Sequence, residues 1–312
     1  MHAGEFPVSA ELVAKLLAAQ FPDWVGRPLT PVVSSGTVNV LFRLGDDLVV
    51  RLPRVDWALG DIETEATWLP RLAPLLPVTI PEQVAAGVPG EGYPWPWSVY
   101  RWLPGTVPVE GALADPLGLA ADLAEFVAAM RAVDLTVTGR RADAAASGRP
   151  HVTAPAAYRG GGHSRLDETA RNALAGLGGV LDPTTLAAAE RAWDADLAVP
   201  DYAGPPVWLH ADLMPGNLLV DPRGRLAAVI DFATLGVGDP SCDLIVAWNL
   251  LTADARAAFR AALDVDEQTW RRGRGRSLAM ALGALVYYHR TNPPFADNAR
   301  YVIDEVLTSS TR

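Results

Sequence analysis

Residues 208–232 read WLHADLMPGNLLVDPRGRLAAVIDF, in which short apolar runs alternate with polar groups. The apolar runs predict buried strands at residues 207–209, 218–220 and 225–230. Pro, Arg and Gly at positions 222–224 predict a turn that joins the last two strands into a hairpin. A strand, a loop and a hairpin of this kind form a frame that holds polar side chains rigidly.

Three polar residues of this frame have the chemistry that phosphoryl transfer requires. Enzymes of that type supply positioning and electrostatics: one carboxylate for the acceptor hydroxyl, and an amide and a second carboxylate for Mg²⁺. Asp212, Asn217 and Asp231 fit these roles in that order. Mg²⁺ prefers oxygen ligands and usually takes only one or two from the protein, so an Asn and an Asp suffice. Each residue alone is more often a turn or cap residue, and the prediction therefore rests on the three together.

A wider set of motifs resembles one family. The chain contains His210-x-Asp212-x-x-x-x-Asn217, then Ile230-Asp231-Phe232, then Gly238-Asp239-Pro240-x-x-Asp243. This order resembles the aminoglycoside phosphotransferase family of small-molecule kinases, which are relatives of the protein kinases. The resemblance implies that Asp212 is the catalytic Asp, that Asn217 and Asp231 bind Mg²⁺, and that His210 orients the catalytic loop. It also implies that Asp243 braces this loop.

The resemblance further implies an α+β fold with two lobes, as in the protein kinases. The N-lobe would be an antiparallel sheet plus one helix, and the C-lobe would be mainly helical. We place the nucleotide-binding N-lobe at residues 1–102 and the C-lobe, with the catalytic loop and the acceptor site, at residues 103–312. A chain of 312 residues is long enough for two such lobes.

The predicted nucleotide loop lies among apolar runs at residues 31–44 and 48–52, which predict a strand pair and a third strand. A hairpin of small polar residues can cover nucleotide phosphates with its backbone amides. The candidates are Ser34, Ser35, Gly36 and Thr37. Ser-Ser-Gly is also an ordinary turn sequence, so both interpretations stay open.

Arg51 lies where kinases carry the Lys that binds the α- and β-phosphates. Arginine keeps the positive charge but presents a planar fork, so its pair with a helix carboxylate would have a different geometry. Residues 61–72 predict the helix that supplies this carboxylate. Glu65 is the candidate partner, or failing that Glu63, and the alternative is that these are solvated surface charges.

The inter-lobe linker is predicted from residues 94–105, which resemble the last N-lobe strand of the family and the segment after it. By that resemblance, the main chains of Arg101 and Leu103 would contact the adenine. Trp95, Trp97 and Trp102 are expected to pack in the core or at its rim.

The rest of the chain is predicted to be mostly helical. Residues 77–84 predict one more strand and residues 138–163 a loop that borders the acceptor site. The arginine-rich run 271–276 is expected at a solvated helix edge, and Asp254 and Arg256 are also expected to be solvated. Apolar spacing predicts helices at 11–20, 116–133, 167–177, 184–197, 244–263, 266–276, 278–290 and 296–307.

Composition restricts the partners. The formal net charge is −10, which disfavours nucleic acid and anionic membranes and modestly favours a cationic ligand. No apolar run is as long as a membrane span, and residues 1–21 read as an amphipathic helix, so we expect a cytoplasmic monomer or homodimer. Cys242 is the only cysteine, which excludes an internal disulfide and a cysteine metal cluster, and we expect it to be a small packed residue.

These observations predict an ATP- or GTP-dependent, Mg²⁺-requiring phosphotransferase that acts on a hydroxyl of a small molecule. The resemblance and the acidic charge favour an aminoglycoside, whose ammonium groups would pair with carboxylates such as Asp297, Asp304 or Glu305. A macrolide kinase or a kinase of a small metabolite such as homoserine or choline is the alternative.

Two other classes remain open. A nucleotide-binding pseudokinase is conceivable because Arg51 replaces the lysine. A metal-dependent hydrolase would use His210, Asp212 and Asp231, but such sites generally need more His and carboxylate ligands than this chain offers.

Overall fold

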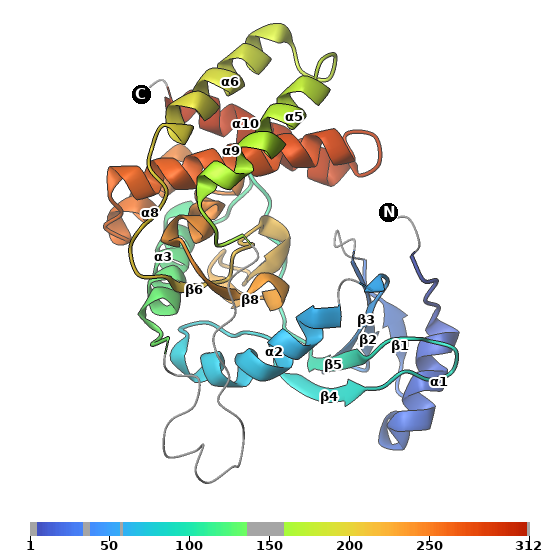
Figure 1. Cartoon of the computed structure of the whole chain (residues 1–312). Coiled ribbons are helices and arrows are strands. Elements are labelled where there is room, and N and C mark those ends of the chain that lie inside the picture. Colours follow the sequence, from blue (N-terminus) through green and yellow to red (C-terminus); the bar gives the residue numbers. More distant parts are fainter. Residues whose placement is uncertain (1–4, 34–37, 57–58, 136–158, 311–312) are drawn as a thin grey trace.

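The computed structural model describes residues 5–33, 38–56, 59–135 and 159–310 and has two lobes (Figure 1). The N-lobe contains a five-stranded antiparallel sheet in the order β1-β2-β3-β5-β4. Its strands are β1 (Leu29–Pro31), β2 (Asn39–Leu44), β3 (Leu48–Pro53), β4 (Gln83–Gly87) and β5 (Trp97–Arg101). The predicted α+β, kinase-like, bilobal fold is confirmed.

Two of the predicted strands are displaced. Within residues 31–44, β1 ends at Pro31 and β2 begins at Asn39, while residues 34–37 lie outside the described part. The prediction of a strand at 77–84 is wrong over most of its length, because Pro77 and Pro81 have no backbone N–H to donate to a ladder. The carbonyl of Thr79 instead accepts from Val229 N at 3.1 Å, so this segment joins the C-lobe.

The first helix, α1 (Ala10–Gln20), covers the N-lobe sheet. The Ser9 side chain accepts from Leu12 N and caps the helix, which ends the extended segment before it. Val13 and Leu16 are fully buried against the sheet core that contains Val50 and Trp97. The expected packing role of Trp97 is therefore confirmed.

The second helix, α2 (Leu59–Leu72), connects the two lobes (Figure 1). Trp68, Leu69 and Leu72 are buried in the core of the C-lobe, and the Trp68 ring lies 4.7 Å from the Trp208 ring of β6. Burial of large aromatic side chains of this kind supplies much of the packing energy of a core. The helix that carries Glu65 is thus fixed to the catalytic lobe.

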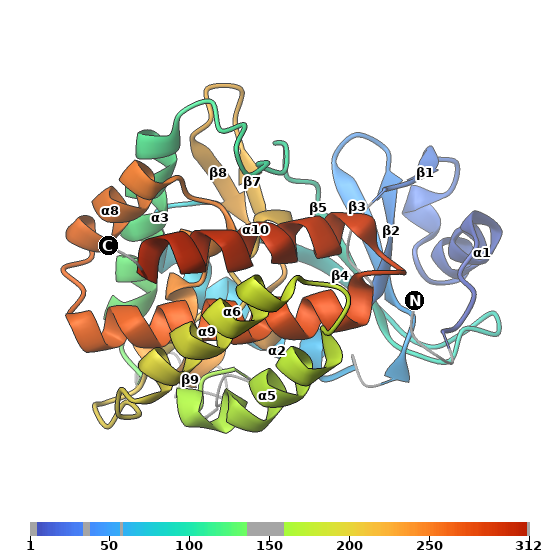
Figure 2. The same ribbon diagram turned by 90° about the horizontal axis from the view of Figure 1, so that it is seen from above.

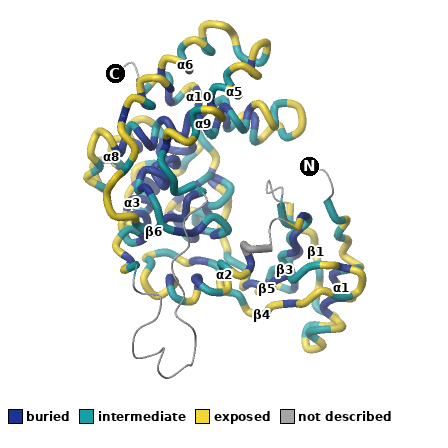
Figure 3. Tube along the Cα trace, viewed as in Figure 1, coloured by how far each residue is buried: buried dark blue, intermediate teal, exposed yellow. Residues whose placement is uncertain are grey.

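The C-lobe is mainly helical and also contains two short two-stranded sheets (Figure 2). Its buried stretches, dark blue in Figure 3, surround α3 and β6. Among the described residues, no helix is long and apolar enough to cross a membrane. The helices are α3 (Pro116–Ala132), α5 (Asp167–Gly176), α6 (Pro183–Leu197), α7 (Val246–Asn249), α8 (Ala253–Ala262), α9 (Glu267–Tyr288) and α10 (Pro293–Ser310), and the strands are β6 (Val207–Leu209), β7 (Leu218–Val220), β8 (Leu226–Val229) and β9 (Gly236–Gly238).

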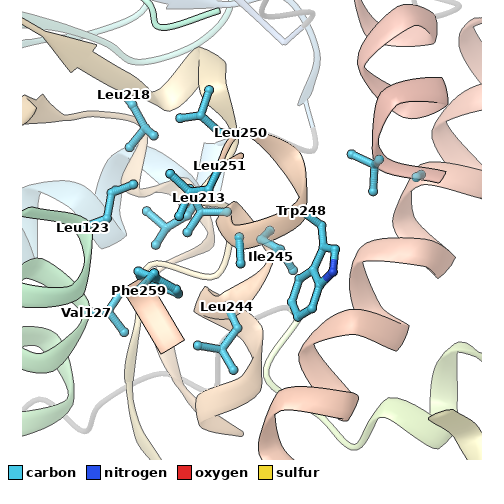
Figure 4. Close-up of a cluster of buried hydrophobic side chains, with 14 of the residues drawn as sticks. Leu123, Val127, Leu213, Leu218, Leu244, Ile245, Trp248, Leu250, Leu251 and Phe259 are labelled. Carbon is cyan, nitrogen blue, oxygen red and sulfur yellow. The ribbon is translucent and has the colours of Figure 1, made fainter. Parts of the chain in front are cut away.

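Three of the predicted helices differ from the structure, and the others agree to within three residues. The helix predicted at 244–263 is broken between α7 and α8, because Leu250 and Leu251 turn into the core (Figure 4) and Thr252 caps a new helix. The two helices predicted at 266–276 and 278–290 are one helix, α9. Ser277 donates its hydroxyl to the Gly273 carbonyl within that helix and does not interrupt it.

The basic residues expected at the surface are partly buried. Arg272 and Arg276 both pair with the buried Asp239 at 3.2 Å, so the prediction of a solvated edge is wrong for them. Arg256 is also buried and pairs with Glu305 at 2.7 Å. In each case a long-range carboxylate compensates the buried charge, which local sequence does not reveal.

The C-lobe core gives a direct test of this packing. Leu123 of α3 is fully buried in it, whereas Leu117 of the same helix is 57% exposed. We expect Leu123→Ala to lower the free energy of unfolding by about 2–5 kcal/mol, because it removes buried surface and leaves a cavity. The matched change Leu117→Ala should alter it by less than about 0.5 kcal/mol in urea denaturation. Equal effects of the two changes would contradict the placement of α3.

Candidate active site

The β7–β8 hairpin brings the two predicted metal ligands together. Asn217 directly precedes β7, and Asp231 lies two residues after the end of β8. The strands pair with Leu218 opposite Val229, and Ile230 N donates to the Asn217 carbonyl at 2.9 Å. Because this register continues by one pair beyond the strands, Asn217 and Asp231 lie at the same end of the hairpin.

A buried carboxylate shapes the loop after β6. The two oxygens of Asp243 accept from the backbone N–H groups of His210 and Ala211 at 2.9 and 2.7 Å. Ala211 has φ 65°, a left-handed conformation that costs a non-glycine residue energy and therefore needs such support. Burial raises the pKa of Asp243, while these N–H groups and the charge of Arg131 oppose the rise. The brace expected from the resemblance is present.

His210 connects this loop to the Asp231 strand. Its ring is fully buried, with Nε2 3.0 Å from the Ile230 carbonyl and Nδ1 3.2 Å from the Asp212 N–H. The ring therefore donates through Nε2 and accepts through Nδ1. It also lies edge-on to Phe232, with ring centroids 4.6 Å apart. Because both ring nitrogens have partners within the protein, His210 positions the loop and has no free nitrogen for a metal. A metal-dependent hydrolase could therefore not use His210 as a metal ligand.

The amide of Asn217 orients Asp212. Its Nδ2 donates to the Asp212 carbonyl at 2.9 Å and to Asp212 Oδ2 at 3.2 Å, which turns the Asn217 Oδ1 away from them and leaves it as a possible metal ligand. The other carboxylate oxygen of Asp212 accepts from Arg159 Nη1. Arg159 was not predicted, because nothing in local sequence relates it to a carboxylate 53 positions away.

The geometry of Asp231 suits a hard cation. This residue has φ 62°, and its side chain is 43% exposed, which leaves the carboxylate open to solvent. Oδ1 accepts from Arg51 Nη2 at 3.2 Å. Oxygens from Asp231 and Asn217 match the preference of Mg²⁺, and the described residues contain no group of three His, Cys, Asp or Glu that could form a complete cage. Nucleotide phosphates would have to complete such a site.

The predicted pair of Arg51 and Glu65 is present. Arg51 Nη1 lies 2.7 Å from Glu65 Oε2, and Glu65 is fully buried, whereas Glu63 is exposed. Glu65 also accepts from the Tyr100 hydroxyl at 2.5 Å and from Phe232 N at 3.0 Å. Neither Arg51 nor Glu65 is a solvated surface charge.

Arg51 remains charged in this site. Burial alone would lower its pKa, but the carboxylates of Glu65 and Asp231 outweigh burial and raise it. Burial and the same Glu65 carboxylate also raise the pKa of Tyr100, so its hydroxyl stays a hydrogen-bond donor. The Asn39 amide oxygen, in the orientation that satisfies its hydrogen bonds, accepts from Arg51 Nε and Nη2 at 3.1 and 3.0 Å. All three guanidinium nitrogens thus have partners.

The linker begins where β5 ends. Arg101 N donates to the Glu82 carbonyl at 2.9 Å, so of its main-chain groups only the carbonyl could bind an adenine. Trp102 N donates to the Asp47 carbonyl at 2.8 Å, and its ring lies under Arg43, in keeping with a packing role. Leu103 follows and is half-buried. The other predicted nucleotide contacts, Ser34, Ser35, Gly36 and Thr37, lie outside the described residues.

The acceptor side is only partly described. Most of the loop predicted at 138–163 lies outside the described residues, which resume at Arg159. Of the three candidate carboxylates, Asp297 and Asp304 are exposed on α10, whereas Glu305 is paired with Arg256. Cys242 is buried, and burial raises its pKa to about 12, so its thiol packs and does not act as a nucleophile at neutral pH.

The sequence matches the model of the phosphotransferase enzyme family over residues 30–276. The chain belongs to this family. None of the curated protein sequences compared with it matches.

Solved structures of family enzymes share its kinase-like fold. The GDP and kanamycin complex of APH(2")-IIia is 19% identical, covers 95% of this chain and 98% of its own, and has a TM-score of 0.72. ADP-bound APH(2'')-Ib is 14% identical, with 96% and 98% coverage and a TM-score of 0.59. Apo macrolide 2'-phosphotransferase MphH from Brachybacterium faecium is 22% identical, with 96% and 98% coverage and a TM-score of 0.58.

Arg51 provides a test of the polar cluster. Arg51→Ala leaves the buried Glu65 without its cation, so we expect a loss of about 3–5 kcal/mol in unfolding free energy. It also removes a positive charge next to the predicted phosphate site, so the nucleotide KM should rise. Arg27→Ala, a more peripheral N-lobe arginine that pairs with Asp47, is the control and should leave KM unchanged. An unaffected KM in Arg51→Ala would remove this residue from the nucleotide site.

Proposed function

We propose that this protein transfers the γ-phosphate of Mg²⁺-bound ATP or GTP to a hydroxyl of a small molecule. The observation that carries the proposal is the arrangement of Asp212, Asn217 and Asp231 at one end of the β7–β8 hairpin. A phosphotransferase needs this combination of a base and two oxygen ligands. Membership of the phosphotransferase family supports the reaction class.

Each residue has a defined task in the proposed reaction. The Asp212 carboxylate accepts the proton of the acceptor hydroxyl as its oxygen attacks the γ-phosphorus and the bond to the β-phosphate oxygen breaks. Asn217 keeps Asp212 in place through the bonds described above and would bind the metal through Oδ1, together with Asp231. When bound, Mg²⁺ neutralises charge on the β- and γ-phosphates.

The nucleotide would bind between the lobe of residues 1–102 and the lobe of residues 103–312. Arg51 would contact its phosphates. The carbonyl of Arg101 and the N–H of Leu103 would contact its base. A related structure contains GDP and another contains ADP, which supports a purine nucleotide and leaves ATP and GTP as joint candidates. Because Arg51 retains its charge and its partner, the pseudokinase alternative loses its main argument.

For the acceptor we propose an aminoglycoside-type antibiotic, with a macrolide as the second candidate. The kanamycin complex of one structural neighbour and the net charge of −10 support the first. The macrolide phosphotransferase among the structural neighbours supports the second. Glu305 is paired with Arg256 and is therefore less available to an ammonium group of an aminoglycoside, which also favours the macrolide. Cytoplasmic ATP or GTP would supply the phosphate.

A nucleotide-consumption screen tests the reaction and the acceptor together. Purified protein with Mg²⁺ and ATP or GTP would be incubated with aminoglycosides, macrolides and small hydroxylated metabolites, and the product identified by mass. We expect one class to gain a phosphate, and Asp212→Asn to lower kcat by about 10²–10⁴ because the base is lost. Nucleotide affinity should change little. Wild-type turnover in Asp212→Asn would exclude Asp212 as the base.

The metal site can be tested separately. Asp231→Ala removes one of two protein oxygens for Mg²⁺, so we expect the Mg²⁺ concentration at half-maximal activity to rise about tenfold or more. Asp221→Ala, in the turn at the opposite end of the same hairpin, is the control and should leave the Mg²⁺ dependence unchanged. Normal metal dependence in Asp231→Ala would contradict the assignment.

A further inference from the structure

One cation contacts the carboxylate that we propose as the base. Arg159 Nη1 donates to Asp212 Oδ1 and lies 3.4 Å from the Ala211 carbonyl. The Arg159 side chain is 34% exposed and is therefore not enclosed by the protein. Neither the predicted roles nor the family motifs include this residue.

The backbone that carries Arg159 is fixed to the C-lobe. Its carbonyl accepts from Cys242 Sγ and from Arg276 Nη1, both at 3.0 Å. The next carbonyl, of Gly160, accepts from Asp239 N at 3.0 Å, and that of Gly161 accepts from Arg276 Nη2. Three successive carbonyls therefore have donors from the lobe core.

The groups that hold this segment are themselves buried. Arg276 pairs with Asp239 at 3.2 Å and donates to Ser241 Oγ at 2.9 Å, and all three residues are nearly inaccessible to solvent. A buried ion pair is costly to desolvate and often adds little stability, so its value here lies in placement. Gly238 adds a steric requirement, because a Cβ there would lie 2.4 Å from the Gly160 carbonyl oxygen.

We propose that Arg159 contacts the γ-phosphoryl group during transfer and stabilises its charge. This inference rests on the proposed function, in which the acceptor hydroxyl donates a hydrogen bond to Asp212 and its oxygen attacks the γ-phosphorus. A guanidinium on Asp212 is therefore within reach of the transferring phosphoryl oxygens, and its fork can bind the carboxylate and the phosphoryl group together. The phosphorus leaves the β-phosphate oxygen for the acceptor oxygen, the proton passes to Asp212, and Arg159 keeps its own protons.

The charge balance of the site favours this role. Asp212 and the γ-phosphate are both anionic and must approach each other, which costs energy in a partly buried site. Arg51, which the proposed function places at the α- and β-phosphates, contacts Glu65 and Asp231 and does not contact Asp212. Among the described residues, the cation that contacts Asp212 is Arg159, and a guanidinium there can pair with γ-phosphate oxygens in the bound nucleotide as well as during transfer.

Binding of two nucleotides tests the proposal without knowledge of the acceptor. Affinities for ADP and for the non-hydrolysable ATP analogue AMP-PNP, each with Mg²⁺, would be measured by calorimetry. Arg159→Ala should weaken AMP-PNP binding by about tenfold or more, because a charge-assisted bond to the γ-phosphate is lost, and should leave ADP binding within about twofold. Arg159→Lys keeps the charge, so its affinity for AMP-PNP should lie between those of the wild type and Arg159→Ala. Arg171→Ala on α5, which pairs with the exposed Asp194, is the control.

Hydrolysis of the nucleotide by water provides the second readout. Arg159→Ala should lower the rate of phosphate release without acceptor, whereas a rate above wild type would overturn the proposal and identify Arg159 as a restraint on Asp212. Unchanged AMP-PNP affinity in a folded Arg159→Ala protein would also overturn it. If the wild type binds neither nucleotide, the proposed function fails together with this inference. If the wild type binds both nucleotides and Arg159→Ala changes neither affinity, only this inference fails.

Discussion

The carboxylate of Glu65 is the interaction on which the rest of the site depends. It is fully buried on α2 and accepts from Arg51 of β3, from Tyr100 of β5 and from the backbone of Phe232 in the C-lobe. A buried charge without partners would be strongly destabilising, so these donors are obligatory. Since Phe232 follows Asp231, the same carboxylate sets the position of the proposed metal ligand relative to the N-lobe sheet. The Trp68–Trp208 contact holds the helix against the C-lobe from the other side.

Arginine at position 51 is adapted to this arrangement. A lysine presents one point charge, whereas the guanidinium fork donates in several fixed directions. Arg51 uses them to contact Glu65, Asp231 and Asn39 at once. The departure from the kinase lysine therefore preserves the charge and adds a direct connection between β2, β3 and the end of β8. In the C-lobe, Asp243 plays a parallel role, because its buried carboxylate holds the backbone before Asp212.

Sequence predicted the parts of this account that depend on local pattern. The hairpin with Asn217 and Asp231 at its end, the pairing of Arg51 with Glu65, and helices such as α3 follow from apolar spacing and from the order of the motifs. Several of the wrong predictions share one cause, which is contact between distant residues. The break before α8 arises because Leu250 and Leu251 enter a core built by other helices, and Arg272 and Arg276 are buried because Asp239 lies opposite them. Arg159 was missed for the same reason.

The affinity of Glu65→Gln for Mg²⁺-nucleotide, measured by calorimetry against the wild type, is the most direct test of this account. A glutamine retains the size of the side chain but removes the charge that Arg51 needs. Its amide has one acceptor oxygen in place of two, so it cannot accept from Arg51, Tyr100 and Phe232 in the way that the carboxylate does. The account predicts binding weaker by about tenfold or more in a protein that still folds, because both Arg51 and Asp231 lose their fixed positions. Wild-type affinity in this variant would contradict the claim that Glu65 organises the site.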